Sequence, residues 1–138
     1  MKTRGNSPKK IPPPRPAIIW RLAAAGLLTC ALLLAVMLDR IPSWLLVYAP
    51  TVAAVSAIAY WIDKRAAVRG DWRVPEARLH ALDLIGGIVG GLVAQVVLRH
   101  KTSKPEFGAI SATIAVLYLG FLGELILRLS IGGMGTSR

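Results

Sequence analysis

Hydrophobic residues in this chain gather in four blocks of about twenty positions, separated by short polar stretches. The blocks show neither the strict alternation of a half-buried strand nor the polar face of a soluble amphipathic helix. At about 1.5 Å per residue, a helical block of this length spans roughly 30 Å, the thickness of the hydrocarbon core of a bilayer. The pattern therefore predicts an all-α fold, a polytopic membrane helical bundle with about four transmembrane helices.

We expect the spans at about 17–38, 41–62, 80–98 and 108–128, within a transmembrane helical domain that covers 17–131. Residues 1–16 form a basic, proline-rich tail that we expect to be disordered, and residues 132–138 form a flexible, glycine-rich tail. The connection at 39–42 is so short that the first two spans should be antiparallel. Arg21 lies near the end of the first span, so its side chain is expected to snorkel outward.

Composition and charge agree with a membrane environment. The chain is 54% hydrophobic and 17% charged, whereas soluble domains have about 25% charged residues. Its net charge of +10 is concentrated in the N-terminal tail and in the stretch 63–78. Because basic residues are retained on the cytoplasmic side, both regions are expected there. The single cysteine, Cys30, excludes an intramolecular disulfide and a cysteine metal site.

The third block contains four glycines in two overlapping small-xxx-small patterns, a feature that lets another helix approach closely in a membrane. We expect these residues to serve helix packing: Gly86, Gly87, Gly90 and Gly91. The block either crosses the membrane or dips in and returns, and the balance of basic residues is nearly the same in both arrangements. We favour a span, because a re-entrant backbone must be buried in protein.

Asp83 is the residue hardest to explain by packing, because a carboxylate in a membrane helix costs about 2.5–3.5 kcal/mol. It shares a helix face with Glu76 and His80. One alternative is a proton-relay or metal cluster that also includes His100. The other, which we favour, is a set of interfacial residues paired with arginines of the preceding stretch, Arg73 or Arg78.

The sequence His100-Lys101-Thr102-x-Lys104 gathers several hydrogen-bond donors at one membrane boundary. Such a loop fits a phosphate or lipid-headgroup pocket, although we favour general attraction to anionic lipid. No catalytic motif occurs, and we expect neither catalytic residues nor a metal or cofactor. Aromatic and basic residues are not interleaved as in single-strand binders, so no direct nucleic-acid binding is expected.

Four linked motifs carry a family resemblance: Asp63-Lys64-x-x-Ala67, Trp72-Arg73-x-Pro75-Glu76-x-x-Leu79-His80, Gly86-Gly87-x-x-Gly90 and Arg99-His100-Lys101-Thr102-x-Lys104-x-x-Phe107. Together they resemble a small bacterial membrane family, the domain-of-unknown-function family 1294. The resemblance implies an integral protein of the bacterial inner membrane without an assigned reaction. Some relatives carry an N-terminal cold-shock domain, where this chain has only its basic tail, so nucleic-acid binding is not carried over.

The leading hypothesis is a non-enzymatic helix-packing module whose basic loop binds anionic lipid headgroups or a partner membrane protein, with a homo-oligomer as another use of the glycines. The alternative is a membrane enzyme or transporter whose polar cluster binds metal, protons or a phosphorylated lipid. The N-terminus is expected in the cytoplasm. The candidate functional cluster is Asp63, Lys64, Arg73, Glu76, His80, Asp83, His100, Lys101, Thr102 and Lys104.

Overall fold

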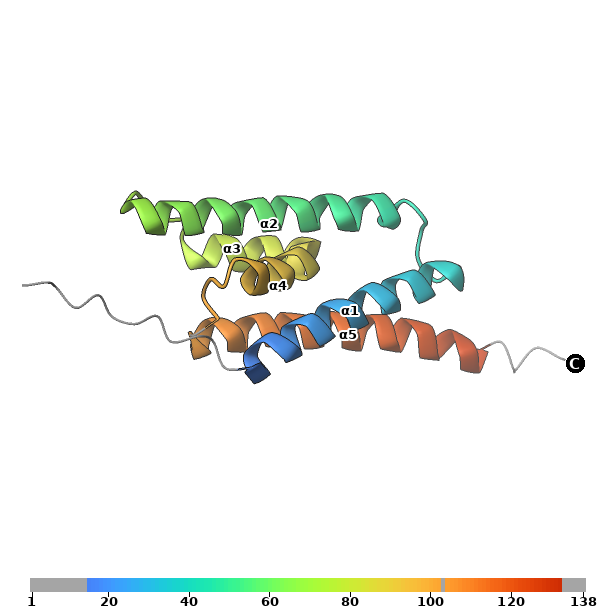
Figure 1. Ribbon diagram of the computed structural model, residues 1–138. Helices are drawn as coiled ribbons and strands as arrows, with labels where there is room; N and C mark the ends of the chain where they lie inside the picture. The colour runs from blue at the N-terminus through green and yellow to red at the C-terminus, as the bar shows by residue number, and fades with distance from the viewer. Residues whose placement is uncertain (1–14, 103, 133–138) are drawn as a thin grey trace, which may run out of the picture.

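The computed structural model describes residues 15–102 and 104–132. In chain order they form α1 (Arg15–Met37), α2 (Leu45–Arg69), α3 (Glu76–Leu82), η1 (Asp83–Gly87), α4 (Ile88–Val97) and α5 (Pro105–Gly132) (Figure 1). The predicted all-α fold is confirmed, since this part of the chain contains no strand. By length and composition, four helical segments are apolar enough to cross a membrane, the third of them being the stretch Glu76–Val97, and this supports an integral membrane protein.

The element boundaries follow the local sequence closely. α1 begins at Arg15, two residues inside the predicted tail, and α5 begins at Pro105, three residues before the predicted span. The remaining parts of the predicted tails, 1–14 and 133–138, lie outside the described residues. α2 ends where Gly70 adopts a left-handed conformation with φ of 75°, which glycine accepts without steric cost. Pro75, which suits a helix start, immediately precedes α3.

The third hydrophobic block folds back on itself. Gly86 in η1 has φ of 124°, a conformation outside the helical region, and the chain reverses there. As a result Lys101 Nζ lies 3.5 Å from Glu76 Oε1, whereas a continuous helix over 76–97 would separate its ends by about 30 Å. The ten steps from Glu76 to Gly86 advance about 15 Å, half the hydrocarbon thickness. The structure therefore has the re-entrant alternative, which corrects our preference for a straight third span.

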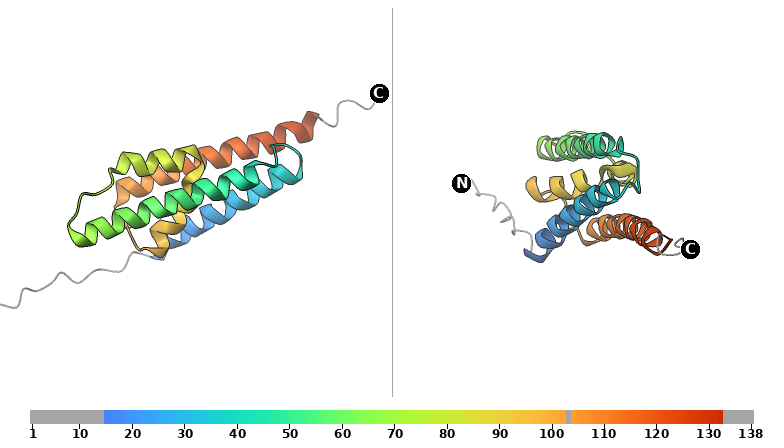
Figure 2. Two further views of the ribbon diagram at one scale, coloured as in Figure 1. Left: turned by 90° about the horizontal axis from the view of Figure 1, so that it is seen from above. Right: turned by 90° about the vertical axis from the view of Figure 1, so that its right-hand side faces the viewer.

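The re-entrant segment, defined as α3, η1 and α4, forms the middle of three layers. α2 covers one side of it, and the pair α1 and α5 covers the other (Figure 1; Figure 2, right). α4 contacts α2 and α1 extensively, and η1 also packs on α2. This burial within the protein satisfies the condition under which a membrane tolerates a broken helix. α2 is therefore joined to α1 and α5 mainly through the re-entrant segment.

Two hydrophobic clusters hold the layers together, and α4 contributes to both. One cluster consists of Ala25, Leu28, Ile88, Leu92, Ile114 and Ala115, from α1, α4 and α5. The other consists of Tyr60, Leu79, Ala94 and Phe107, from α2, α3, α4 and α5. Large apolar side chains elsewhere on α1, α2 and α5 face outward, as expected for helices surrounded by lipid.

Candidate functional site

The two ends of the re-entrant segment meet beside the C-terminal part of α2, and charged side chains come together there. Lys101, in the loop that follows α4, lies with its Nζ 3.1 Å from Asp63 Oδ2 and 3.5 Å from Glu76 Oε1. Its side chain is buried, and its backbone has a positive φ of 58°. One ammonium group therefore bridges a carboxylate from α2 and another from the start of α3.

Asp63 is the centre of this end cluster. Its carboxylate is fully buried and accepts hydrogen bonds from the Val74 backbone N–H at 3.0 Å and from His100 Nε2 at 2.7 Å. The half-exposed Arg73 lies farther away, with its Nε at 3.8 Å. Asp63 thus ties both the 70–75 connection and the loop after α4 to the last turns of α2.

His100 lies in the loop after α4, outside the helices. Burial lowers the pKa of His100 below its ordinary value, and the nearby Lys101 and Arg73 act in the same direction. The hydrogen bond and charge of Asp63 oppose this shift without cancelling it. At neutral pH the imidazole is therefore uncharged and carries its proton on Nε2, where it donates to the carboxylate.

Two further contacts complete the end of the molecule. Lys104 Nζ lies 2.8 Å from Glu76 Oε1 in a pair exposed to solvent, a geometry that contributes little to stability. Behind it, Lys101 lies over the Phe107 ring at 4.8 Å, and the His80 ring packs on the same phenyl group at 4.2 Å between centroids. Within the described residues neither ring nitrogen of His80 has a hydrogen-bond partner.

Asp83 belongs to a second, deeper cluster. Its fully buried carboxylate accepts hydrogen bonds from Ser56 Oγ at 2.9 Å and from Tyr60 Oη at 2.7 Å. These partners are hydroxyl groups on α2, so the expected pairing with Arg73 or Arg78 does not apply to this residue. Asp83 and His100 therefore do not share a site, and the described residues contain no group of side chains arranged to hold a metal ion.

The deeper cluster continues through α4 to α1 and α5. Gln95 Nε2 donates to Tyr60 Oη and to Ser111 Oγ, both at 3.2 Å, and Gln95 Oε1 accepts from Arg21 Nε at 2.8 Å. Arg21 Nη1 also donates to the Ala17 carbonyl at 2.5 Å. Since only 2% of Arg21 is exposed, the expectation that it snorkels outward is wrong: its guanidinium turns into the protein.

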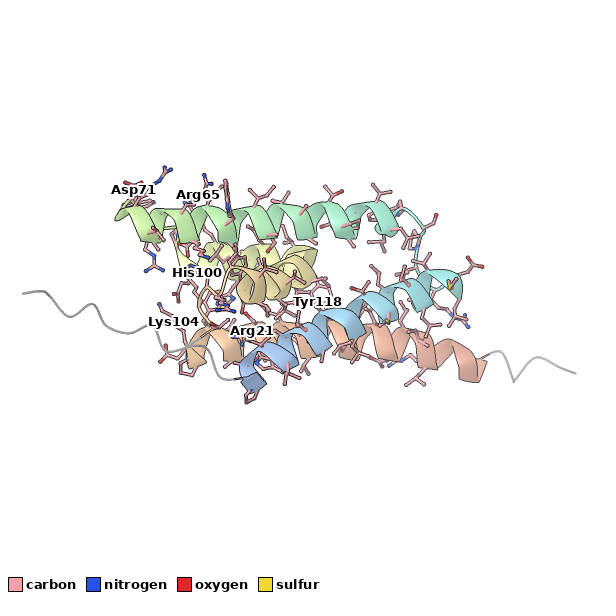
Figure 3. The ribbon with its side chains drawn as sticks, in the orientation of Figure 1. Arg21, Arg65, Asp71, His100, Lys104 and Tyr118 are labelled. Atoms are coloured by element: carbon pink, nitrogen blue, oxygen red, sulfur yellow. The ribbon has the colours of Figure 1, made fainter. Side chains whose placement is uncertain are left out.

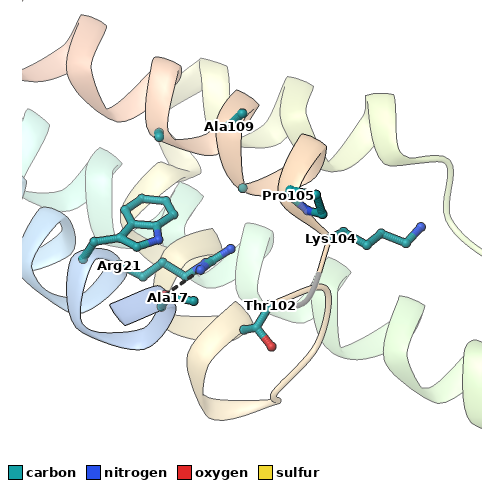
Figure 4. A pocket seen from close by; sticks show the side chains of 9 residues that line it. Ala17, Arg21, Thr102, Lys104, Pro105 and Ala109 are labelled. Atoms are coloured by element: carbon teal, nitrogen blue, oxygen red, sulfur yellow. Dashed lines mark hydrogen bonds between the residues drawn. The ribbon is translucent and has the colours of Figure 1, made fainter. Parts of the chain in front are cut away.

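A groove lies between α1, α5 and the loop that joins α4 to α5 (Figure 4). Its volume is about 640 Å³, within the range of ligand pockets. Arg21 projects into it from α1, and the buried Thr102 lines it from the loop. Apart from Lys104, small or apolar residues form the remaining wall. The lining consists of Ala17, Trp20, Arg21, Thr102, Lys104, Pro105, Gly108, Ala109 and Ala112.

The predicted cluster is therefore divided among three places. The end cluster contains Asp63, Arg73, Glu76, His100, Lys101 and Lys104, with His80 beside it. Asp83 lies in the deeper cluster and Thr102 in the groove. Lys64 donates from Nζ to the Leu98 carbonyl at 2.5 Å, a favourable interaction for a cation at the C-terminal end of α4.

The glycines of the third block are used for contacts within the chain. A Cβ at Gly90 would overlap the backbone of Ala53 on α2, and a Cβ at Gly91 would overlap the Asp83 carboxylate. Gly87 likewise packs on α2. The close approach that the small-xxx-small pattern predicts is thus an approach between α4 and α2 and across the re-entrant turn.

Sequence reasoning missed most of the deeper cluster. Ser56, Gln95 and Ser111 each stand alone in an apolar block, and a single small polar residue gives little signal. Tyr60 lies near the end of a span, where tyrosine is usually interfacial, although here it is fully buried. The sequence did contain one indication: Arg21 and Asp83 carry opposite charges and stand in different hydrophobic blocks. Buried opposite charges in a membrane protein tend to be linked.

Residues 53–107 match the model of a family described as "Protein of unknown function (DUF1294)". This match confirms the resemblance drawn from the four motifs. The match covers 55 of the 138 residues. The matched region runs from the middle of α2 through the re-entrant segment to the first turn of α5, so it includes the end cluster and Asp83. No curated protein and no solved structure matches the chain significantly.

Proposed function

We propose that this DUF1294 protein is a non-enzymatic membrane module whose basic end binds anionic lipid headgroups. One observation carries the proposal: the re-entrant turn brings the basic stretch after α2 and the basic loop after α4 to the same end of the molecule. In Figure 3, His100 and Lys104 lie toward the same end of the molecule as Arg65 and Asp71. A straight third span would have separated them by the whole membrane.

The charges at this end are not balanced by its own carboxylates. Asp63 and Glu76 are engaged by Lys101, His100 and Lys104, as described above. Several arginines remain exposed around them, and each basic side chain near an anionic membrane surface contributes about 1 kcal/mol of attraction. These exposed residues are Arg65, Arg69, Arg73, Arg78 and Arg99.

Aromatic side chains support a position at the headgroup level. The Arg65 guanidinium lies 3.8 Å from the centre of the exposed Trp61 ring, and Trp72 in the 70–75 connection is highly exposed. Tryptophan is enriched at membrane interfaces because one part of the ring is apolar and the other can donate a hydrogen bond. By the positive-inside rule the proposal assigns this end to the cytoplasmic side of a bacterial inner membrane, together with the N-terminus.

Lipid preference in nanodiscs tests the proposal. Brominated phosphatidylglycerol and brominated phosphatidylcholine should quench the tryptophans near the basic end unequally, with stronger quenching by the anionic lipid. Replacing Arg65 and Arg69 by glutamine should weaken this preference, because two of the five exposed arginines are lost, whereas Arg40→Gln at the opposite end should leave it intact. Equal quenching by both lipids in the unchanged protein would falsify the proposal.

A transporter of protons or anions is the second candidate, favoured by the continuous buried hydrogen bonds from Arg21 to Asp83. Proton relays in membrane proteins use such chains. Proteoliposomes containing the protein would then show a proton leak that Asp83→Asn abolishes. A leak equal to that of empty liposomes removes this candidate and leaves the lipid-binding proposal unaffected.

A further inference from the structure

The groove beside Arg21 combines a buried cation with an apolar wall. Arg21 is held in place by its bonds from Nε to Gln95 and from Nη1 to the Ala17 carbonyl. Its third nitrogen, Nη2, points to the Gly108 side of the groove, where an added Cβ would lie 3.0 Å away. Among the described residues, Nη2 has no hydrogen-bond acceptor and no carboxylate contacts the guanidinium.

Two charged side chains line the groove, Arg21 and Lys104, and among the described residues only Lys104 has a carboxylate partner. Lys104 pairs through its ammonium with Glu76 at 2.8 Å, and Figure 4 shows its side chain extending away from Arg21. The Thr102 side chain lies on the loop side of the same space and can donate from its hydroxyl group. A guanidinium N–H that faces a groove can donate to an anion bound there, and such a charge-assisted hydrogen bond is stronger than one between neutral groups.

The position of the groove points to the source of that anion. It lies in the first two turns of α1 and α5, beside the loop after α4 and therefore at a membrane boundary. Trp20 borders it, as expected for an indole at the headgroup level. Its wall of alanine, glycine and proline lies between two helices whose outer faces are exposed to lipid, so an acyl chain can run along it.

We propose that this groove binds one anionic phospholipid, with the headgroup phosphate on Arg21 Nη2 and the Thr102 hydroxyl and with an acyl chain against α5. The inference rests on the proposed function, and it makes the preference for anionic lipid specific to one molecule. It differs from general attraction in predicting a fixed stoichiometry of one lipid per chain. It also differs in depending on the shape of the groove as well as on its charge.

Native mass spectrometry of the detergent-solubilised protein with phosphatidylglycerol tests the inference. The unchanged protein should retain one phosphatidylglycerol. Ala109→Trp should lose it, because the indole fills the groove while leaving Arg21 in place. Ile110→Trp is the matched control, since this exposed neighbour adds the same bulk outside the groove and should retain the lipid. Circular dichroism checks that both variants remain folded.

Further measurements distinguish a bound lipid from a soluble phosphate compound. They also distinguish failure of this inference from failure of the proposed function. Excess glycerol 3-phosphate should not displace the lipid; displacement would assign the groove to a soluble phosphate compound and overturn the inference. Retention by Ala109→Trp equal to that of Ile110→Trp would also overturn it. Replacing Arg65 and Arg69 by glutamine should weaken the general preference while the single bound lipid remains, so either proposal can fail alone.

Discussion

The hydrogen bonds between Arg21 and Asp83 all run in one direction. Arg21 donates to Gln95, Gln95 donates to Tyr60, and Tyr60 donates to Asp83. An amide and a phenol thus connect a cation on α1 to a carboxylate in η1 without direct contact between the charges. Bonds aligned in this way polarise one another, and each unsatisfied member is costly in a low-dielectric interior. Gln95 is the link on which both halves depend.

Replacing Gln95 by leucine should therefore destabilise the protein by about 1–3 kcal/mol, because the buried Arg21 Nε and Tyr60 hydroxyl lose a partner. Thermal unfolding in detergent measures the change. Val93→Leu is the control, since it alters an exposed position on the same helix. If the two variants unfold at the same temperature, the hydrogen-bonded link does not stabilise the fold.

His100 predicts a dependence of stability on pH. The pKa of His100 is lowered in the folded protein, so the unfolded chain binds the proton more readily, and its ordinary pKa is about 6.5. The contribution of His100 to the free energy of unfolding is therefore fully present above about pH 6.5. It is lost as the pH falls toward the lower pKa that His100 has in the folded protein. Unfolding temperatures measured from neutral to acidic pH should fall less steeply for His100→Gln, which retains a donor for Asp63. Parallel curves would contradict the assignment.

At the scale of elements, the re-entrant segment shows what a sequence can and cannot specify. The apolar blocks, the helix end at Gly70 and the helix start after Pro75 follow from local composition and were predictable. The reversal at Gly86 was not, because the same glycines also suit a straight helix in close contact with a neighbour. The choice depends on α2 packing on η1 and α4 and on α1 packing on α4, which is a property of the folded whole.

The partners of isolated polar residues were beyond sequence reasoning for a similar reason. Asp83 could be recognised as costly, but its contact with Tyr60 crosses from η1 to α2. Gln95 and Arg21 are separated by 74 positions along the chain. Periodicity reports which face of one helix a residue occupies and does not report which neighbour packs on that face. The end cluster was easier to anticipate because its members stand at the ends of elements.

Gly90→Ala tests the close contact of α4 with α2. The added methyl group would overlap the Ala53 backbone, so the helices must separate, and such overpacking costs about 1–3 kcal/mol. Gly120→Ala on α5 is the matched control: its Cβ would meet nothing within 4 Å, and alanine favours the helix. Urea or thermal unfolding should show destabilisation for the first variant alone. Equal stability of both variants would contradict the observed packing.

The whole molecule has unequal halves because the re-entrant segment fills only the layer near the basic end. α1, α2 and α5 are long helices of 23, 25 and 28 residues, whereas the re-entrant segment turns back at Gly86 partway along the bundle (Figure 1). The loop after α4 must then lie on the same side of the membrane as the 70–75 connection. A straight third span would instead put these two segments on opposite sides. Whether the 70–75 connection and the loop after α4 lie on the same side of the membrane therefore tests the fold of the whole chain.

Cysteine labelling of intact cells makes this distinction directly. In a Cys30→Ala background, Asp71→Cys and Glu106→Cys should both resist an impermeant maleimide, and both should react after the membrane is opened. Ser43→Cys, in the connection between α1 and α2, should react from outside and is the internal control. Because Asp71 and Glu106 flank the re-entrant segment, opposite labelling of these two positions would mean that the third block crosses the membrane. The end cluster would then be impossible, and with it both lipid-binding proposals.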